Sequence, residues 1–155
     1  MVTGKVVGVK DGDTIQILSK TNNEPKVYDI RLAEIDAPEK HQAYGNKSKQ
    51  ALSDKIFGKE VSITVISTDR YGRIVAQVHI GDRWINREMA VEGWAWQYIQ
   101  YSKSKELAQA EQQARNKKLG LWADKDPIPP WEWRKPTQVK PEAENQIQPL
   151  FKVEW

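Results

Sequence analysis

Residues 30–39 of the chain read Ile-Arg-Leu-Ala-Glu-Ile-Asp-Ala-Pro-Glu, and the rest of the sequence is organised around this stretch. Its first half is mostly apolar, as in a β-strand, and Arg31 stands inside that run. Pro38 has no N–H for a β-ladder and favours an extended residue before it. The strand is therefore predicted to end where Asp36 and Glu39 bring two carboxylates.

The charged groups of this stretch suit two kinds of partner. Arg31 carries a planar fork of N–H donors, which matches the oxygens of a phosphate group. Asp36 and Glu39 supply hard carboxylate oxygens, the ligands that Ca²⁺ and Mg²⁺ prefer. The alternative is a strand end with ordinary surface charges, and so short a motif does not by itself separate the two interpretations.

Composition limits the class of protein. The 155 residues are enough for one domain with a real core, and 39% hydrophobic with 29% charged residues is typical of a soluble globular chain. The absence of cysteine excludes disulfides, thiolate zinc sites and cysteine nucleophiles. With only His41 and His79, a histidine-rich zinc site is not expected. No apolar run approaches the roughly 20 residues of a membrane-spanning helix, so no membrane partner is expected.

The positive charge lies in the body of the chain. The formal net charge is +3, and the excess of Lys and Arg over Asp and Glu falls in residues 1–122. A basic body modestly favours a polyanionic partner such as nucleic acid.

Strand-like runs precede the central stretch. Asp11-Gly12-Asp13 is a strong hairpin motif because glycine tolerates a positive φ. A meander of three strands is expected at residues 4–10, 14–18 and 26–35. This arrangement allows Asp13 to face Asp36 across the sheet.

Helical and strand patterns alternate after the central stretch. Three runs have a helical period, the second of them with Asn86 as its expected N-cap, and two runs are rich in β-branched residues. Five strands with a helix between the third and fourth predict an α+β fold, a five-stranded Greek-key barrel of the oligonucleotide-binding (OB) type with three helices. The strands are expected at residues 60–67 and 73–80, and the helices at residues 45–57, 86–92 and 104–118.

The composition changes near the C-terminus. Six of the eight prolines fall there, together with Trp131 and Trp133. Such a segment favours turns and polyproline conformation over helix or sheet. We predict a folded domain over residues 1–122 and a Pro/Trp-rich extension over residues 123–155, which docks partly on the domain and has little order of its own from Pro136 onward.

Carboxylates from two separate stretches are candidates for a metal site. Asp13 follows the first turn, and Asp36 and Glu39 end the central stretch. Carboxylates brought together repel one another unless a cation or protons relieve the charge. A divalent ion would relieve it and would also polarise a phosphoryl oxygen. The alternative is a set of unrelated aspartates that stabilise turns.

A second arginine follows the turn between the fourth and fifth strands. Residues 69–72 read Asp-Arg-Tyr-Gly, and Arg73 then stands at a strand start where its guanidinium can be fixed. Two arginines and a metal ion are what phosphoryl transfer requires, because negative charge grows on the phosphate oxygens. Tyr71, Tyr98 and Tyr101 are candidates for stacking on bases, or for ordinary packing.

Four stretches in this order resemble the staphylococcal nuclease, or thermonuclease, family: residues 11–14, 31–39, 69–73 and 119–122. The resemblance spans residues 4–122, and several motifs in one register are far more specific than any one of them. It implies an OB barrel with Ca²⁺-dependent phosphodiesterase activity on DNA and RNA, leaving 3′-phosphate and 5′-hydroxyl ends. It also implies single-stranded or unstacked substrates and a monomeric protein.

The resemblance assigns a role to each matching residue. The Ca²⁺ ion is held by two carboxylates and one backbone carbonyl, a glutamate accepts a proton from the attacking water, and two arginines bind the scissile phosphate. An arginine–tyrosine pair contacts phosphate, and a further tyrosine completes the base pocket. The catalytic residues would be Arg31, Glu39 and Arg73, the Ca²⁺ ligands Asp13, Asp36 and Ala37, and the substrate-binding residues Arg70, Tyr71, Tyr98 and Tyr101.

The sequence departs from the familiar family pattern at several places. Ala37 stands where the best-known member has threonine, a change that a backbone carbonyl ligand survives. Arg70 stands where lysine is the familiar residue, and the loop over residues 40–48 is shorter. The extension has no counterpart in the minimal domain.

Compartment and activity each leave an alternative. Proteins of this family are typically exported, so the resemblance favours a secreted or periplasmic protein. The sequence, however, begins at an apparent first strand without a signal peptide. The alternative function is a catalytically silent OB module that binds nucleic acid or protein. Degenerate domains of that kind typically lose one or more key side chains, and this sequence retains all of them: Asp13, Arg31, Asp36, Glu39 and Arg73.

Overall fold

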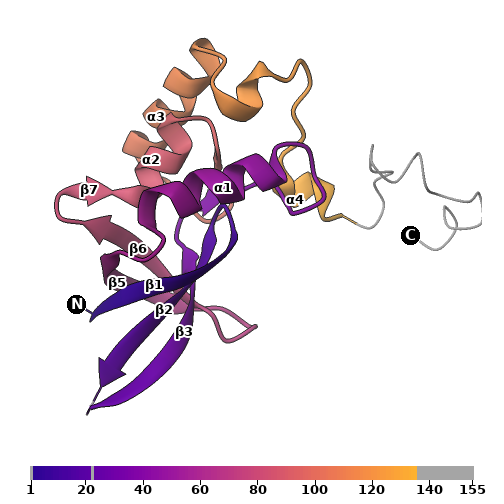
Figure 1. Ribbon diagram of the computed structural model, residues 1–155. Coiled ribbons are helices and arrows are strands. Elements are labelled where there is room, and N and C mark those ends of the chain that lie inside the picture. The colour runs from indigo at the N-terminus through magenta and orange to yellow at the C-terminus, as the bar shows by residue number, and fades with distance from the viewer. Residues whose placement is uncertain (1, 22, 136–155) are drawn as a thin grey trace, which may run out of the picture.

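In the computed structural model, which describes residues 2–21 and 23–135, a β-barrel fills one half of the molecule and helices cover the other (Figure 1). The strands are β1 (Val2–Asp11), β2 (Thr14–Thr21), β3 (Glu24–Leu32), β4 (Ile35–Asp36), β5 (Glu60–Thr68), β6 (Ile74–Ile80), β7 (Arg83–Trp84) and β8 (Trp96–Gln97). The helices are α1 (Gly45–Ile56), α2 (Ile85–Val91), α3 (Lys105–Asn116) and α4 (Pro130–Trp133), with a 3₁₀ turn over Gly120–Ala123. The prediction for Pro136 onward lies outside the described residues.

The barrel closes through one parallel contact. Strands β3, β2, β1, β5 and β6 are hydrogen-bonded in that order as antiparallel neighbours. The last then pairs in parallel with the first, from Ile30 opposite Ile74 to Leu32 opposite Ala76. The α+β fold with a closed five-stranded OB barrel and three longer helices is therefore confirmed.

One continuous core joins the barrel to the helices. Helix α1 buries Ser48, Leu52 and Ile56 along one face, because these residues recur at a helical spacing. The largest fully buried side chains are Val6, Ile15, Ile17, Ile30, Leu32, Ile35, Leu52, Ile56, Ile63, Ile85, Met89 and Leu107.

No helix in the described part of the chain is long and apolar enough to cross a membrane.

The central stretch forms two strands where the sequence predicted one. Strand β3 ends at Leu32, and Glu34 has a φ of 66°, in the left-handed region that interrupts a strand. The following strand, β4, leaves the barrel and pairs with β8. The expectation of one strand through residue 35 is wrong, because the break directs the chain out of the barrel and places Asp36 opposite Trp96 of β8.

A buried asparagine fixes this break. Asn86 donates from Nδ2 to the carbonyl oxygens of Ala33 (2.9 Å) and Ala76 (3.3 Å). Its Oδ1 accepts a hydrogen bond from the backbone N–H of Val78 (2.9 Å). Because helix α2 already begins at Ile85, the predicted N-cap role of Asn86 is wrong. A fully buried amide needs such partners, and these tie the ends of β3 and β6 to α2.

The partly buried carboxylate of Glu88, in α2, forms ion pairs with α1 and β7. Glu88 Oε1 lies 2.8 Å from Arg83 Nη2 and 3.0 Å from Lys55 Nζ. The hydrogen bonds from Arg83 lower the pKa of Glu88 to about 2 against the opposing effect of partial burial, and Lys55 adds to the lowering. A lowered pKa means that the charged carboxylate stabilises the fold above its ordinary pKa and that this contribution is lost as the pH falls through the lowered value.

Replacing Glu88 by glutamine is therefore expected to lower the free energy of unfolding by about 1–2 kcal/mol at pH 7, after discounting for solvent exposure. The difference from the unchanged protein should shrink below a pH of about 4 and vanish near the lowered pKa of about 2. Urea unfolding across this pH range measures it, with Glu24→Gln at an exposed position of β3 as the control. A difference that stayed constant across the range would contradict the ion pairs.

Candidate active site

One cleft of about 920 Å³ gathers every residue predicted for the site. It lies between the β1–β2 turn, the segment from β3 to β4, the β5–β6 turn, and the turn after β8. The predicted residues that line it are Asp13, Arg31, Asp36, Ala37, Glu39, Arg70, Tyr71, Arg73, Tyr98 and Tyr101. The fold thus brings together side chains from stretches that lie far apart in the sequence.

Arg31 is held in place by the turn that ends β3. Its Nη1 donates to the carbonyl oxygens of Leu32 (3.0 Å) and Ile35 (2.9 Å). Its Nη2 lies 3.3 Å from Asp36 Oδ1, and Nη1 lies 3.4 Å from Asp13 Oδ2. Because the backbone fixes the guanidinium, no conformational search is needed before it meets a ligand in the cleft.

Asp13 and Asp36 both lie within 3.4 Å of this guanidinium. The sequence predicted that they would face each other across the sheet, but Asp36 lies in β4, which pairs with β8 outside the barrel. Asp13 Oδ2 accepts a hydrogen bond from the backbone N–H of Ala37 (2.7 Å), and its Oδ1 accepts one from the Thr14 hydroxyl (2.9 Å). Both aspartates are buried. The β1–β2 turn is thereby fixed against the start of the loop that carries Glu39.

Glu39 is positioned by a tightly folded loop before α1. Its backbone N–H donates to the side-chain oxygen of Gln42 (3.1 Å), and its carbonyl accepts from the Gln42 backbone N–H (2.9 Å). Gly45 packs so closely that a Cβ there would overlap the Glu39 carbonyl. The glycine is thus needed for the close approach of two backbone segments.

The sequence predicts that Glu39 is a catalytic residue. On that prediction, replacing Gly45 by alanine is expected to lower kcat by about tenfold or more, because the backbone at Glu39 must move and a misplacement of about 1 Å can cost 10²-fold. The matched control is Gly58→Ala. Gly58 has a φ of 78° and open space around it, so alanine there strains the backbone without touching the cleft. Steady-state kinetics on both variants, corrected for the folded fraction, check the result. An equal loss of kcat in the two would contradict a positional role for Gly45.

Arg73 is oriented by Asp69 across a tight turn. Asp69 Oδ2 accepts from Arg73 Nε (2.7 Å), and Oδ1 accepts from the backbone N–H groups of Tyr71 (2.9 Å) and Arg73 (3.0 Å). Burial opposes the charge, but these hydrogen bonds outweigh it and hold the pKa of Asp69 below its ordinary value. Within the described residues the two terminal nitrogens of Arg73 make no hydrogen bond. They are therefore available to a ligand.

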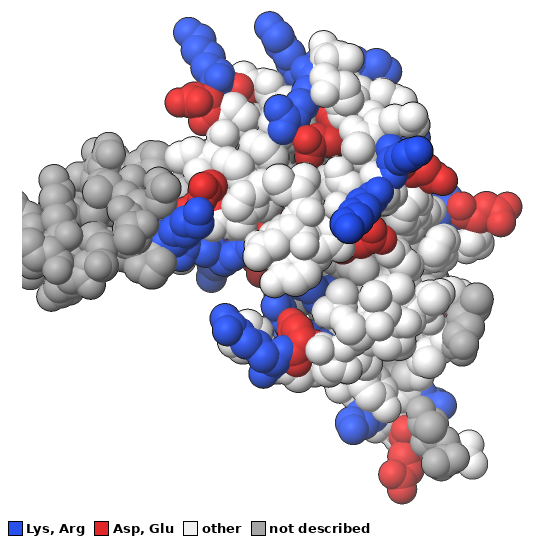
Figure 2. Space-filling view, turned by 180° about the vertical axis from the view of Figure 1, so that it is seen from behind, with Lys and Arg blue, Asp and Glu red and all other residues white. Residues whose placement is uncertain are grey.

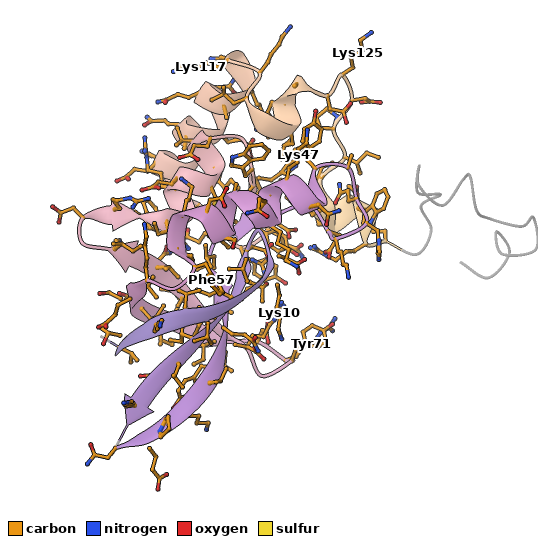
Figure 3. All side chains as sticks on the ribbon, in the orientation of Figure 1. Lys10, Lys47, Phe57, Tyr71, Lys117 and Lys125 are labelled. Atoms are coloured by element: carbon orange, nitrogen blue, oxygen red, sulfur yellow. The ribbon has the colours of Figure 1, made fainter. Side chains whose placement is uncertain are left out.

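Arg70 and Tyr71 lie at the exposed tip of the same turn. Tyr71 is 69% exposed, and Figure 3 shows it at the protruding end of the β5–β6 loop. Arg70 Nη2 donates to the Tyr71 hydroxyl (2.8 Å), and its guanidinium carbon lies 5.0 Å from the centre of the ring. The pair offers a cation and an aromatic face at the rim of the cleft.

The other two tyrosines stand together at the turn after β8. The rings of Tyr98 and Tyr101 meet edge to face at 4.8 Å, and Tyr98 also lies 6.0 Å from the Arg31 guanidinium carbon. Glu34 holds this turn, because its carbonyl accepts from the Tyr98 N–H (2.9 Å) and its carboxylate from the Ser102 hydroxyl (2.9 Å). The left-handed residue that breaks β3 thus also places the aromatic rings.

Two acidic groups in the cleft carry raised pKa values. Burial, with the charge of Asp13, raises the pKa of Asp36 to about 6, although the side chain of Arg134 opposes the rise. Burial raises the pKa of Asp11 to about 6 as well, with Asp13 and Glu39 adding to it. A raised pKa means that the charged carboxylate is disfavoured, and a nearby cation would stabilise it.

Sequence reasoning missed Asp11 and Arg134 as site residues. Asp11 carried a usable signal, because it stands two positions before Asp13 in the same hairpin turn and lines the same cleft. Arg134 carried none. It lies 98 residues from Asp36 in the sequence and reaches it only through the fold.

The donor set suits a hard divalent cation that takes backbone or water ligands as well. The cleft presents oxygens from Asp13, Asp36 and Glu39, and the guanidinium of Arg134 already shows that the Asp36–Glu39 pair accepts a cation. Within the described residues no three His, Cys, Asp or Glu side chains are grouped tightly enough to hold a metal by themselves. Ca²⁺ takes six to eight oxygen ligands, including carbonyls and waters, so these residues fit it.

Known proteins resemble the chain over most of its length. The family model described as staphylococcal nuclease homologue matches residues 29–124. An uncharacterized endonuclease of Haemophilus influenzae is 47% identical over 137 residues, which is 88% of this chain and 75% of that protein. An uncharacterized endonuclease of Escherichia coli is 44% identical (86% and 85%), and a micrococcal nuclease of Shigella flexneri is 38% identical (85% and 80%). The OB barrel, the cleft and these matches together show that the chain belongs to the staphylococcal nuclease homologue family, a family of nucleases.

Proposed function

We propose that the protein is a Ca²⁺-dependent nuclease that hydrolyses phosphodiester bonds of DNA and RNA to leave 3′-phosphate and 5′-hydroxyl ends. The observation that carries the proposal is the position of Arg31, which lies within 3.4 Å of both Asp13 and Asp36 in a cleft that Glu39 and Arg73 also line. Such a cleft offers cationic donors to a phosphate and carboxylates to an ion and a water at the same place.

Each residue then has a distinct task. Arg31 and the terminal nitrogens of Arg73 bind the non-bridging oxygens of the scissile phosphate, where charge grows in the transition state. Glu39 accepts a proton from the attacking water, whose oxygen forms the new bond to phosphorus. The 5′ oxygen leaves with the electrons of the broken bond and takes up a proton. When bound by Asp13, Asp36 and the Ala37 carbonyl, Ca²⁺ would supply charge stabilisation to the phosphate.

The aromatic residues suit bases that are not paired. Tyr98 stands beside Arg31, Tyr101 meets Tyr98 edge to face, and Tyr71 lines the same cleft, so a base attached to the bound phosphate can stack on an aromatic ring. On the face shown in Figure 2, the described Lys and Arg side chains alternate with Asp and Glu and form no broad basic patch. The aromatic rings that line the cleft support single-stranded or unstacked substrates.

The test uses the full chain with labelled single-stranded DNA and RNA oligonucleotides, in Ca²⁺ and then in excess chelator. Cleavage in Ca²⁺ that stops with chelator is expected, and the products should carry a phosphate that phosphatase removes from the 3′ end. Equal cleavage under both conditions would overturn the metal requirement. A 5′-phosphate on the products would overturn the assigned bond.

A second candidate is a silent OB module that binds nucleic acid without cutting it. The observation that favours it is that Asp36 and Glu39 are both engaged by Arg134, so the predicted ligand and proton acceptor are occupied. Tight, salt-sensitive oligonucleotide binding with no turnover at any Ca²⁺ concentration would support this function over the first.

A further inference from the structure

The C-terminal extension returns to the active-site cleft. Gln42, in the loop after Glu39, donates from Nε2 to the carbonyl of Ile128 (2.6 Å). The ring of Trp131 stacks on Tyr98 with centres 5.5 Å apart and planes 6° from parallel. Trp131 also meets Trp96 edge-on at 5.6 Å. Helix α4 is thereby held at the end of the cleft, beside the loop that leads into α1 (Figure 1).

Arg134, which follows α4, binds both acidic groups at that end. Its guanidinium forks the Asp36 carboxylate, with Nη1–Oδ1 at 3.0 Å and Nη2–Oδ2 at 2.7 Å. The same Nη1 lies 2.7 Å from Glu39 Oε1, and Nη2 donates to the Tyr98 hydroxyl at 3.2 Å. One planar cation therefore engages the predicted metal ligand and the predicted proton acceptor together.

The Arg134 contacts face the open side of the cleft. The side chain of Asp36 is 1% exposed and that of Arg134 is 37% exposed, so the guanidinium covers the carboxylate from the solvent side. Burial alone would lower the pKa of Arg134, but Asp36 and Glu39 outweigh it and raise that pKa. The guanidinium is thus charged under all conditions of interest and cannot leave by losing its proton.

Arg134 and a divalent ion need the same oxygens. Oxygen ligands lie about 2.3–2.6 Å from Ca²⁺, which would put the ion next to a guanidinium that already forks both oxygens of Asp36. Two cations that close repel each other strongly where water is excluded. The ion pair between Arg134 and Asp36 and a divalent ion bound at Asp36 therefore exclude one another.

We propose that Arg134 is a latch: an internal cation that occupies Asp36 and Glu39 until a divalent ion displaces it. The proposal rests on the proposed function, because it needs the ion to bind at Asp36. Opening the latch moves the Arg134 guanidinium away from Asp36 and Glu39 and frees Glu39 to accept a proton. The apparent affinity for Ca²⁺ is then weaker than the intrinsic affinity by the fraction of molecules in which the latch is open.

Calorimetric titration of Ca²⁺ into the metal-free full chain at pH 8 tests the latch without relying on activity. Arg134→Gln is expected to bind Ca²⁺ about tenfold more tightly, because the ion no longer has to break a charge-assisted hydrogen bond, and a tenfold change in affinity is about the size of one such bond. Lys135→Gln is the matched control. It also removes one positive charge next to α4, but Lys135 pairs with Glu132 at 2.6 Å and not with Asp36 or Glu39, so the affinity for Ca²⁺ should not change. Arg134→Lys, which keeps the charge but loses the fork, should fall between the two.

Thermal unfolding gives a second measurement. Without metal, Arg134→Gln should melt at a lower temperature than the unchanged protein, because Asp36 loses a partner. Saturating Ca²⁺ should then raise its melting temperature more than it raises that of the unchanged protein. This comparison stays informative if the variant is partly destabilised.

The outcomes separate the two proposals. Equal or weaker Ca²⁺ affinity in Arg134→Gln overturns the latch, while Ca²⁺-dependent cleavage by the same proteins would leave the nuclease function intact. A loss of oligonucleotide binding with unchanged Ca²⁺ affinity would also overturn it and would make Arg134 a substrate-binding residue. If none of the proteins bound Ca²⁺, the metal assignment would fail and the latch with it.

Discussion

Replacing Glu39 by glutamine is expected to lower kcat by about 10²–10⁴-fold, because an amide has nearly the same shape as the carboxylate but cannot accept a proton from the attacking water. Substrate affinity should stay within a few-fold of that of the unchanged protein, since Arg31 and Arg73 are left in place. Single-turnover cleavage of an oligonucleotide, with binding measured separately in the absence of turnover, separates the two quantities.

Two further variants make the result specific to Glu39. Asp36→Ala should instead weaken the affinity for Ca²⁺, because it removes two carboxylate oxygens from the proposed ligand set. Glu106→Gln changes an exposed carboxylate of α3 and should leave both quantities unchanged. Full turnover in Glu39→Gln would remove the glutamate from the role of proton acceptor, whatever the ion does.

Local chemistry explains which parts of the site were predictable. The Asp11-Gly12-Asp13 turn, the strand that carries Arg31 and the Asp69–Arg73 turn each follow from residues that are neighbours in the sequence. Barrel closure then brings the three together, since β3 lies beside both β2 and β6. Once the OB topology is predicted, the meeting of Asp13 and Arg31 follows from it, because Thr14 pairs with Arg31 across β2 and β3. The position of Asp36 depends in addition on the break at Glu34.

The features that sequence missed depend on distant partners. The left-handed turn at Glu34 is held by Ser102, which is 68 residues away. Asn86 reads as an N-cap because asparagine favours helix starts, yet tertiary contacts with Ala33 and Ala76 decide its position. No periodicity encodes such contacts. Arg134 belongs to the same class.

Replacing Arg73 by lysine is expected to lower kcat/KM by about 10²–10³-fold, even though the charge is kept. Arg73 uses Nε to bind Asp69 at 2.7 Å, which leaves two terminal nitrogens in a fixed plane for phosphate oxygens. A lysine has one nitrogen on a flexible stem. It can contact Asp69 or the phosphate, but it cannot donate to two phosphate oxygens while Asp69 holds it in place. The loss should fall mainly on kcat, because the contact strengthens as charge develops in the transition state.

Arg70→Lys is the matched control for this substitution. Arg70 lies in the same turn and is exposed, and its guanidinium donates to the Tyr71 hydroxyl, so lysine there should change kcat/KM by no more than about threefold. A large loss in both variants would mean that the turn needs arginine for its own conformation. A small loss in both would mean that charge alone matters at Arg73. Only a loss confined to Arg73→Lys fits a guanidinium that is fixed by Asp69 and aimed at the phosphate.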